Sequence, residues 1–135
     1  MAWLIDSSVF VELDRHGESL RALETIVPSE SFAISSITAS ELLVGVHRTT
    51  SERQRVTRQH FVETVLNALL VLPFDVDVAR THAWLFVELT SRGRRIESHD
   101  MIIAATALTH DYAVLTHNVR HFERVPGLTV QQPRW

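Results

Sequence analysis

The chain has 135 residues, of which 45% are apolar, and a formal net charge of −3, which fits one globular domain. It contains no cysteine, so disulfide frameworks and cysteine-ligated zinc or iron–sulfur sites are excluded. Every basic residue is arginine, which excludes lysine Schiff-base chemistry and the lysine of a Walker-type phosphate loop. The sequence shows neither a signal-peptide pattern nor an apolar run of about 18 residues, so we expect a soluble, cytoplasmic protein.

Short apolar runs alternate with amphipathic stretches along the chain, which indicates strands that alternate with helices. Pro28 ends one predicted helix, and Thr38 with Glu41 has the spacing of a capping box that would begin another. In chain order we predict a strand over 3–5, helices over 7–14 and 18–27, a strand over 32–34, a helix from Thr38 through Val46, a helix over 51–69, a strand over 70–74, helices over 75–91 and 99–110, a strand over 113–116, a turn around Phe122 and a last strand over 128–130.

This alternation predicts an α/β fold. Parallel neighbouring strands need a crossover connection, usually a helix, so we expect a three-layer α/β/α arrangement around a central, mainly parallel sheet of four to five strands. In such sheets, ligands bind beyond the carboxyl ends of the strands. Polar residues at these ends are therefore the candidates for a functional site.

Four separate segments place carboxylate or amide oxygens near that end of the predicted sheet. Asp6 follows the first strand, and Glu41 lies early in the helix after the second. Asp100 opens the helix before the fourth strand, and Asn118 follows that strand. Each has a local alternative as a capping residue or as an acid at a helix start. Capping alone gives no reason for all four to converge.

The residue types suit a divalent metal ion. Mg²⁺ and Mn²⁺ bind hard oxygen ligands, and three carboxylates placed close together would repel one another without a cation. A bound divalent ion can activate water and stabilise charge on a phosphoryl group. The pattern therefore indicates a nuclease that holds Mg²⁺ or Mn²⁺ at Asp6, Glu41 and Asp100.

The same residues stand in motifs that resemble those of PIN-domain ribonucleases, the fold of the VapC toxins. The motifs are Leu4–Val9, Ser40–Val46, Asp100–Leu108, and Val114–Asn118 followed by Phe122. They occur in the family's order and span nearly the whole chain. The resemblance implies a single PIN domain over residues 1–135. It also implies a metal-dependent endoribonuclease that serves as the toxin of a type II toxin–antitoxin pair.

The resemblance further implies roles for single residues. By position, Asp6, Glu41 and Asp100 match the three acids of the family's catalytic metal site. Asn118 matches a fourth catalytic position, where many members have Asp and others Asn.

Two small polar residues, Ser8 and Thr116, match positions that support the site. His121 departs from the pattern, because many relatives have Asp just before the Phe. The fourth acid is thus missing from both places where the family has it.

For partners, the resemblance implies a homodimer and a cognate VapB-type antitoxin, which inserts a basic segment into the acidic site. The substrate would be RNA, and no membrane partner is expected. Arginine binds phosphate through a planar fork of donors. Two clusters are therefore candidate RNA contacts, although both could equally be solvated helix ends: Arg53, Arg55 and Arg58, and Arg92, Arg94 and Arg95.

Other classes of site fit less well. A receiver domain needs a Lys beside its phosphorylated Asp, and a serine hydrolase needs Gly-x-Ser-x-Gly; the chain has neither. His117 and His121 are four residues apart, but no third zinc ligand or His-Glu-x-x-His motif accompanies them. The alternative that remains open is a non-catalytic PIN-like binding module.

Overall fold

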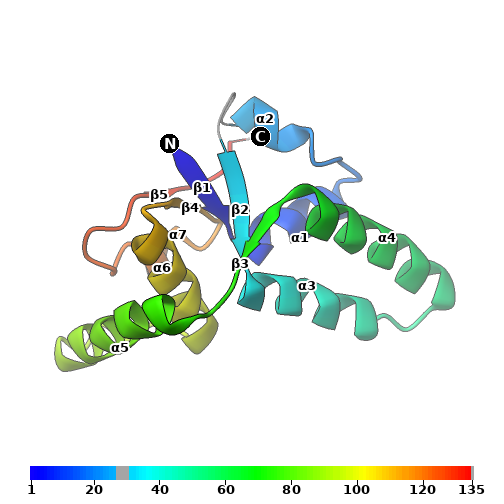
Figure 1. The fold of residues 1–135 in the computed structure, drawn as a ribbon. Coiled ribbons are helices and arrows are strands. Elements are labelled where there is room, and N and C mark those ends of the chain that lie inside the picture. Colours follow the sequence, from blue (N-terminus) through cyan, green and yellow to red (C-terminus); the bar gives the residue numbers. More distant parts are fainter. Residues whose placement is uncertain (27–30, 135) are drawn as a thin grey trace.

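The computed structural model describes residues 1–26 and 31–134, and a five-stranded sheet forms its centre (Figure 1). The strand order is β3-β2-β1-β4-β5, and each pairing between these strands is parallel. The central strand is β1, in which Leu4 is aligned with Ala33 on one side and with Val114 on the other. The strands are β1 (Ala2–Ile5), β2 (Ser31–Ser35), β3 (Leu70–Leu72), β4 (Ala113–Leu115) and β5 (Val130–Gln131).

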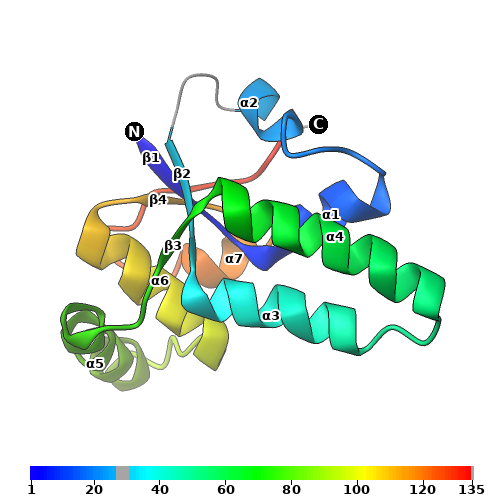
Figure 2. The same ribbon diagram turned by 45° about the vertical axis from the view of Figure 1, so that its right-hand side comes forward.

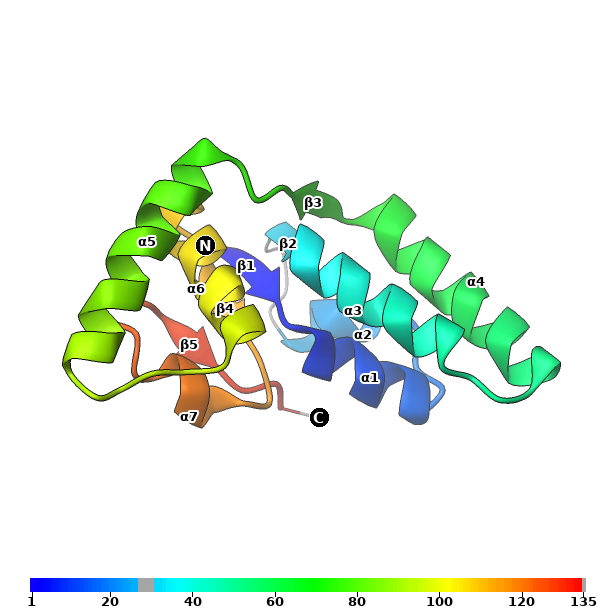
Figure 3. The same ribbon diagram turned by 90° about the horizontal axis from the view of Figure 1, so that it is seen from below.

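Helices cover both faces of the sheet, which confirms the predicted three-layer α/β fold (Figures 2 and 3). Successive residues of a strand point to opposite faces, so Ile5 packs into one buried cluster and Leu4 into another. The first cluster lies under α1 to α4 and the second under α5 to α7. The helices are α1 (Ser7–Arg15), α2 (Ala22–Ile26), α3 (Ser36–His47), α4 (Glu52–Ala68), α5 (Val76–Ser91), α6 (Ser98–His110) and α7 (Val119–Phe122).

The helix predicted over 18–27 is wrong at its start, and its last residue lies outside the described residues. Gly17, with φ +67°, ends α1, and the chain then forms a turn before α2 begins at Ala22. In this turn the amide of Ala22 donates to the carbonyl of Ser19 over 3.1 Å, an i to i−3 bond that winds the chain more tightly than an α-helix. Buried Leu23 anchors the short α2 in the core.

The predicted capping box of Thr38 and Glu41 is also wrong. The cap of α3 is Ser35, whose Oγ accepts the amide hydrogen of Thr38 over 3.1 Å, and the helix begins at Ser36. Thr38 is instead buried within the first turn, where its hydroxyl accepts a hydrogen bond from Ser35. Glu41 therefore lies one turn further into the helix than a capping residue would, and its carboxylate is available for other contacts.

All five strands differ from prediction at their ends: β1 by one residue at its start, β2 by one residue at each end, β4 by stopping at Leu115 rather than at Thr116, and β3 and β5 by two residues at one end. β3 stops at Leu72 because Pro73 has no amide hydrogen for the sheet, and Asp75 then caps α5 by accepting from the amide of Val78. β5 starts at Val130, after a turn that contains Gly127 at φ +78°. Within the described residues, we find no helix long and apolar enough to cross a membrane.

Candidate functional site

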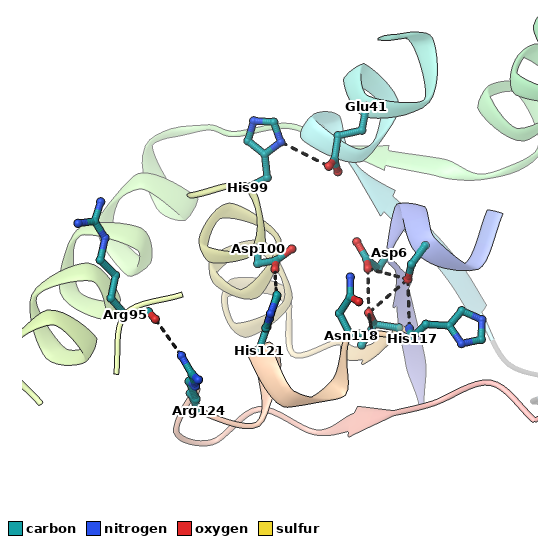
Figure 4. A network of polar contacts seen from close by, with 11 residues as sticks. Asp6, Glu41, Arg95, His99, Asp100, His117, Asn118, His121 and Arg124 are labelled. Carbon is teal, nitrogen blue, oxygen red and sulfur yellow. Dashed lines mark hydrogen bonds and ion pairs between the residues drawn. The ribbon is translucent and has the colours of Figure 1, made fainter. Parts of the chain in front are cut away.

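The polar residues selected from the sequence lie at the carboxyl edge of the sheet. Asp6 follows β1, the next strand β2 leads into the helix that carries Glu41, and Asn118 comes shortly after β4. Asp100 lies in the first turn of α6. Figure 4 shows the three carboxylates facing a common region, with Asn118 between Asp6 and Asp100 in that view. The parallel topology brings these four segments together, because adjacent parallel strands end at the same edge.

Asp6 is the most firmly held of the three acids. It is 2% exposed, and its Oδ2 accepts hydrogen bonds of 2.8 Å from both Ser8 Oγ and Thr116 Oγ1. The two hydroxyls also accept amide hydrogens, from His117 and Asn118 respectively. Among the described contacts the Asp6 side chain makes no helix-capping bond to α1, so capping does not explain it. Among the described residues, no side-chain hydrogen bond reaches Oδ1, so this oxygen could contact a ligand.

Glu41 reaches the site from α3. Its Oε2 lies 3.4 Å from Nδ1 of His99, whereas Oε1 is buried and has no hydrogen-bond partner among the described residues. Burial raises the pKa of Glu41 above its ordinary value, and the negative charges of Asp6 and Asp100 raise it further, against the opposing effect of the His99 contact. Burying a carboxylate oxygen without a hydrogen bond costs free energy, and a bound cation would offset that cost.

Asp100 is the third acid, and its side chain is only 9% exposed. Its Oδ2 lies 2.8 Å from Nδ1 of His121, which comes from α7. Burial is the main reason that the pKa of Asp100 is raised, and the negative charges of Asp6 and Glu97 add to the effect. The contact with His121 lowers this pKa but does not reverse the shift.

The sequence analysis missed the two histidine contacts. The sequence marks His121 as a departure from the family pattern and as half of an incomplete zinc motif, and it gives His99 no role beyond the start of a predicted helix. The position of His99 directly before Asp100 was the one available hint. The roles of both depend on how α3, α6 and α7 meet in space.

A divalent cation fits this donor set. In the part of the chain that the structure describes, no group of three His, Asp or Glu side chains is already close enough to hold an ion. Each acid contacts its own neighbour instead, namely Ser8 and Thr116, His99, or His121. Burial, with a smaller contribution from neighbouring negative charges, raises the pKa values of Glu41 and Asp100, and Glu41 Oε1 has no hydrogen-bond partner among the described residues. A bound cation would offset both the burial and the repulsion.

A groove of about 800 Å³ lies beside Glu41, between α1, α3 and α4. Arg53 and Arg58 line it, as does apolar Phe61. Arg58 is partly engaged, because its Nε lies 3.4 Å from Oδ2 of Asp14. Arg55, the third member of the predicted cluster, is not in the lining and pairs with Glu52 along the helix.

The second arginine cluster lies farther from the acids, around the end of α5. Arg92 forms an ion pair with Glu88. The carbonyl of Arg95 accepts a hydrogen bond from Arg124 at 3.0 Å, and Figure 4 shows both residues apart from the three carboxylates. Arg94 is exposed in the turn that follows α5.

The fold and the motifs have matches among known proteins. A family model described as the PIN domain matches residues 3–128. Ribonuclease VapC1 of Rickettsia felis is 37% identical over 96% of this chain and 95% of its own length. The tRNA(fMet)-specific endonuclease VapC of Salmonella typhimurium is 32% identical over 73% of this chain and 72% of its own. Among solved structures, VapBC-5 from Mycobacterium tuberculosis, a member of the VapBC family of toxin–antitoxin systems, contains a chain with a TM-score of 0.76 and 29% identity, covering 99% of this chain and 98% of that one. The chain therefore belongs to the PIN-domain family and, within it, to the VapC proteins.

Proposed function

We propose that this chain is a divalent-metal-dependent endoribonuclease and the toxin of a type II toxin–antitoxin pair. The observation that carries the proposal is the convergence of Asp6, Glu41 and Asp100 at the carboxyl edge of the sheet, where two of the three have raised pKa values. VapC relatives that align over most of this chain are named as ribonucleases, and one is named as an endonuclease specific for a tRNA. The whole chain, residues 1–135, would form one PIN domain that acts in the cytoplasm.

In the proposed mechanism, Asp6, Glu41 and Asp100 would hold Mg²⁺ or Mn²⁺. A divalent ion supplies Lewis acidity, by which water is activated for attack on phosphorus and the developing negative charge is stabilised. Ser8 and Thr116 fix one oxygen of Asp6 and leave the other for the ion. Asn118 has no charge, so it offers a carbonyl oxygen or orients the attacking water.

RNA would reach the carboxylates along the groove beside α4. Arg53, Arg58 and Glu41 all line this groove, so an RNA strand whose phosphates contact the two arginines would extend toward the acidic site. Arg55, Arg92, Arg94 and Arg95 stay weaker candidates, because they lie outside the lining. Their contribution would be a general attraction for the RNA backbone.

A cognate VapB-type antitoxin would neutralise the enzyme with a basic segment. An acidic site without RNA attracts a cationic side chain, and arginine pairs with carboxylates in two parallel hydrogen bonds. We expect an Arg or Lys of the antitoxin's C-terminal segment to contact Asp6 or Asp100. Deleting that segment should restore cleavage, whereas full inhibition by an antitoxin without basic residues there would contradict the assignment.

A homodimer completes the proposed assembly. On α5, Trp84 and Val87 are 54% and 66% exposed, which is a large apolar area for a helix facing water. Light scattering after gel filtration measures the mass directly, and a mass equal to one chain at micromolar concentration would contradict the dimer.

The activity itself is tested with purified, antitoxin-free protein on total RNA and on purified tRNA. We expect cleavage with Mg²⁺ or Mn²⁺, loss of cleavage in excess EDTA, and recovery when metal is restored. Cleavage that is equally fast in EDTA would contradict the metal mechanism. Absence of cleavage in every metal, together with retained binding of antitoxin, would favour the non-catalytic module.

A further inference from the structure

Two histidines contact two of the three acids of the site, Asp100 and Glu41. His121 Nδ1 lies 2.8 Å from Asp100 Oδ2, and His99 Nδ1 lies 3.4 Å from Glu41 Oε2. Figure 4 shows the two rings on different sides of the acidic region. Both bring imidazole nitrogen, a donor type different from the oxygens of the three carboxylates.

The exposure of the two partners matters for what His121 can do. The Asp100 side chain is 9% exposed, whereas the His121 side chain is 47% exposed. The carboxylate is therefore largely enclosed by the protein, whereas the ring that contacts it is about half exposed. A cation that bound Asp100 Oδ2 would therefore lie near Nδ1 of His121.

The spacing of the two atoms suits a pair of metal ligands. In an octahedral site with bonds of about 2.1 Å, neighbouring ligand atoms are about 3.0 Å apart. The separation of 2.8 Å between Nδ1 and Oδ2 is close to that value. To coordinate one ion together, the two atoms would lose the proton between them and the ring would turn, so that the Nδ1 lone pair points at the ion rather than at Oδ2.

His99 is the weaker of the two candidates. It directly precedes Asp100 on α6, and consecutive residues of a helix do not face the same direction. Its ring contacts Glu41, whose Oε1 still lacks a partner. His121 comes from α7 and faces Asp100 from outside that helix.

We propose that His121 is a ligand of the metal site together with Asp100, and that its nitrogen makes the site favour Mn²⁺ over Mg²⁺. The proposal rests on the proposed metal-dependent ribonuclease function. Mg²⁺ strongly prefers oxygen ligands, whereas transition-metal ions gain affinity from an imidazole nitrogen. In the coordinating form Nδ1 offers its lone pair and the ring proton resides on Nε2, a tautomer open to any half-exposed histidine.

Pulsed electron paramagnetic resonance of bound Mn²⁺ tests the ligand directly. In the wild-type protein we expect hyperfine coupling from a directly bound ¹⁴N nucleus. The coupling should disappear in His121→Asn and persist in His99→Gln, the matched control. Absence of coupling in the wild type, or its persistence in His121→Asn, would overturn the proposal. Thermal unfolding of each variant verifies that the fold is retained.

Calorimetric titration with Mn²⁺ and Mg²⁺ separates a ligand from a residue that merely orients Asp100. For a ligand, His121→Asn should lower Mn²⁺ affinity about tenfold and Mg²⁺ affinity much less, within the range that substitutions around metal sites produce. His121→Asp should raise Mg²⁺ affinity and also reduce the preference for Mn²⁺. An equal loss for both metals in His121→Asn would overturn the proposal and leave His121 as a positioning residue.

The two proposals fail in different ways. If the wild-type protein binds no divalent ion, the metal-dependent ribonuclease and the His121 ligand are both wrong. If it binds Mn²⁺ and cleaves RNA but shows no bound nitrogen, only the assignment of His121 is wrong.

Discussion

Thr116 and Asp6 are 110 residues apart in the sequence, yet Thr116 Oγ1 donates a hydrogen bond of 2.8 Å to Asp6 Oδ2. The same hydroxyl oxygen accepts the amide hydrogen of Asn118. Thr116 thus holds the carboxylate of Asp6 and, at the same time, the backbone of the segment that follows β4. Its side chain is a positioning element of the proposed metal site.

Replacing Thr116 with valine should keep the shape of the side chain and remove both hydrogen bonds. We expect cleavage to fall about 10- to 100-fold, as is typical when a partner of a metal ligand is lost. Thr116→Ser restores the hydroxyl and should recover most of the activity. The measurement is the initial rate of RNA cleavage at saturating metal. A Thr116→Val variant with the wild-type rate would show that Ser8 alone holds Asp6.

Asp6→Asn and Asp100→Asn should abolish cleavage almost completely and leave the protein folded. An amide keeps the size of the side chain but lacks the negative charge that binds a divalent ion. Removing this charge also relieves the repulsion between carboxylates in the metal-free site, so the fold should be retained. Asp111→Asn is a matched control, because Asp111 ends α6 at φ 59°, a conformation that Asn also tolerates. Near-normal cleavage by Asp100→Asn would contradict the whole site assignment.

Asn118 should behave differently from the three acids. Since it has no charge to lose, Asn118→Ala should reduce cleavage only about 10- to 100-fold. Asn118→Asp adds a fourth carboxylate and should tighten divalent binding in calorimetry. Tighter metal binding does not have to speed cleavage, because it can stabilise the ground state and the transition state equally and so leave the activation barrier unchanged. An Asn118→Ala variant as inactive as Asp6→Asn, or unchanged metal affinity in Asn118→Asp, would show that the role assigned to Asn118 is wrong.

The raised pKa of Glu41 makes the stability of the metal-free protein depend on pH. Between the ordinary value of 4.5 and the raised value, the folded state binds more protons than the unfolded state. The free energy of unfolding should therefore decrease as the pH rises through this range. Urea unfolding in EDTA at several pH values measures it, and Glu41→Gln should give a flatter curve. A wild-type curve that rises more steeply than that of Glu41→Gln would contradict the shift.

If RNA binds in the groove beside α4, the salt dependence of its affinity should reveal the phosphate contacts. If Arg53 contacts an RNA phosphate, Arg53→Gln should weaken RNA binding and reduce the slope of log affinity against log salt by about 0.7. Arg80→Gln is the control, because Arg80 is exposed on α5 and does not line the groove. Fluorescence anisotropy at several salt concentrations, with Ca²⁺ in place of the catalytic metal, provides both quantities. Equal slopes for the two variants would exclude a phosphate contact at Arg53.

Much of the fold could be predicted from the sequence, because each strand is a short apolar run between helical patterns. The convergence of Asp6, Glu41 and Asp100 followed from the parallel topology, which places the carboxyl ends of adjacent strands together. Local rules were less reliable where two residues compete for one role. Ser35 rather than Thr38 caps α3, since a side chain just before the helix can reach the free amides of its first turn.

The histidine contacts could not be predicted in this way. His121 and Asp100 meet because α7 packs near the start of α6, and no pattern of sequence spacing encodes that packing. The same holds for the groove, whose lining combines residues of three helices. Such features depend on how helices that are not neighbours in the sequence lie in space.

The central place of β1 also has a consequence for synthesis of the chain on the ribosome. β1 emerges first, but one of its two neighbours, β4, is made more than 100 residues later, and the amide of Asp6 bonds to the carbonyl of Leu115 in that strand. A nascent or truncated chain that stops before β4 lacks Thr116 and leaves β1 with an open edge, which can pair with other chains. We therefore expect that fragments from interrupted translation aggregate and lack ribonuclease activity.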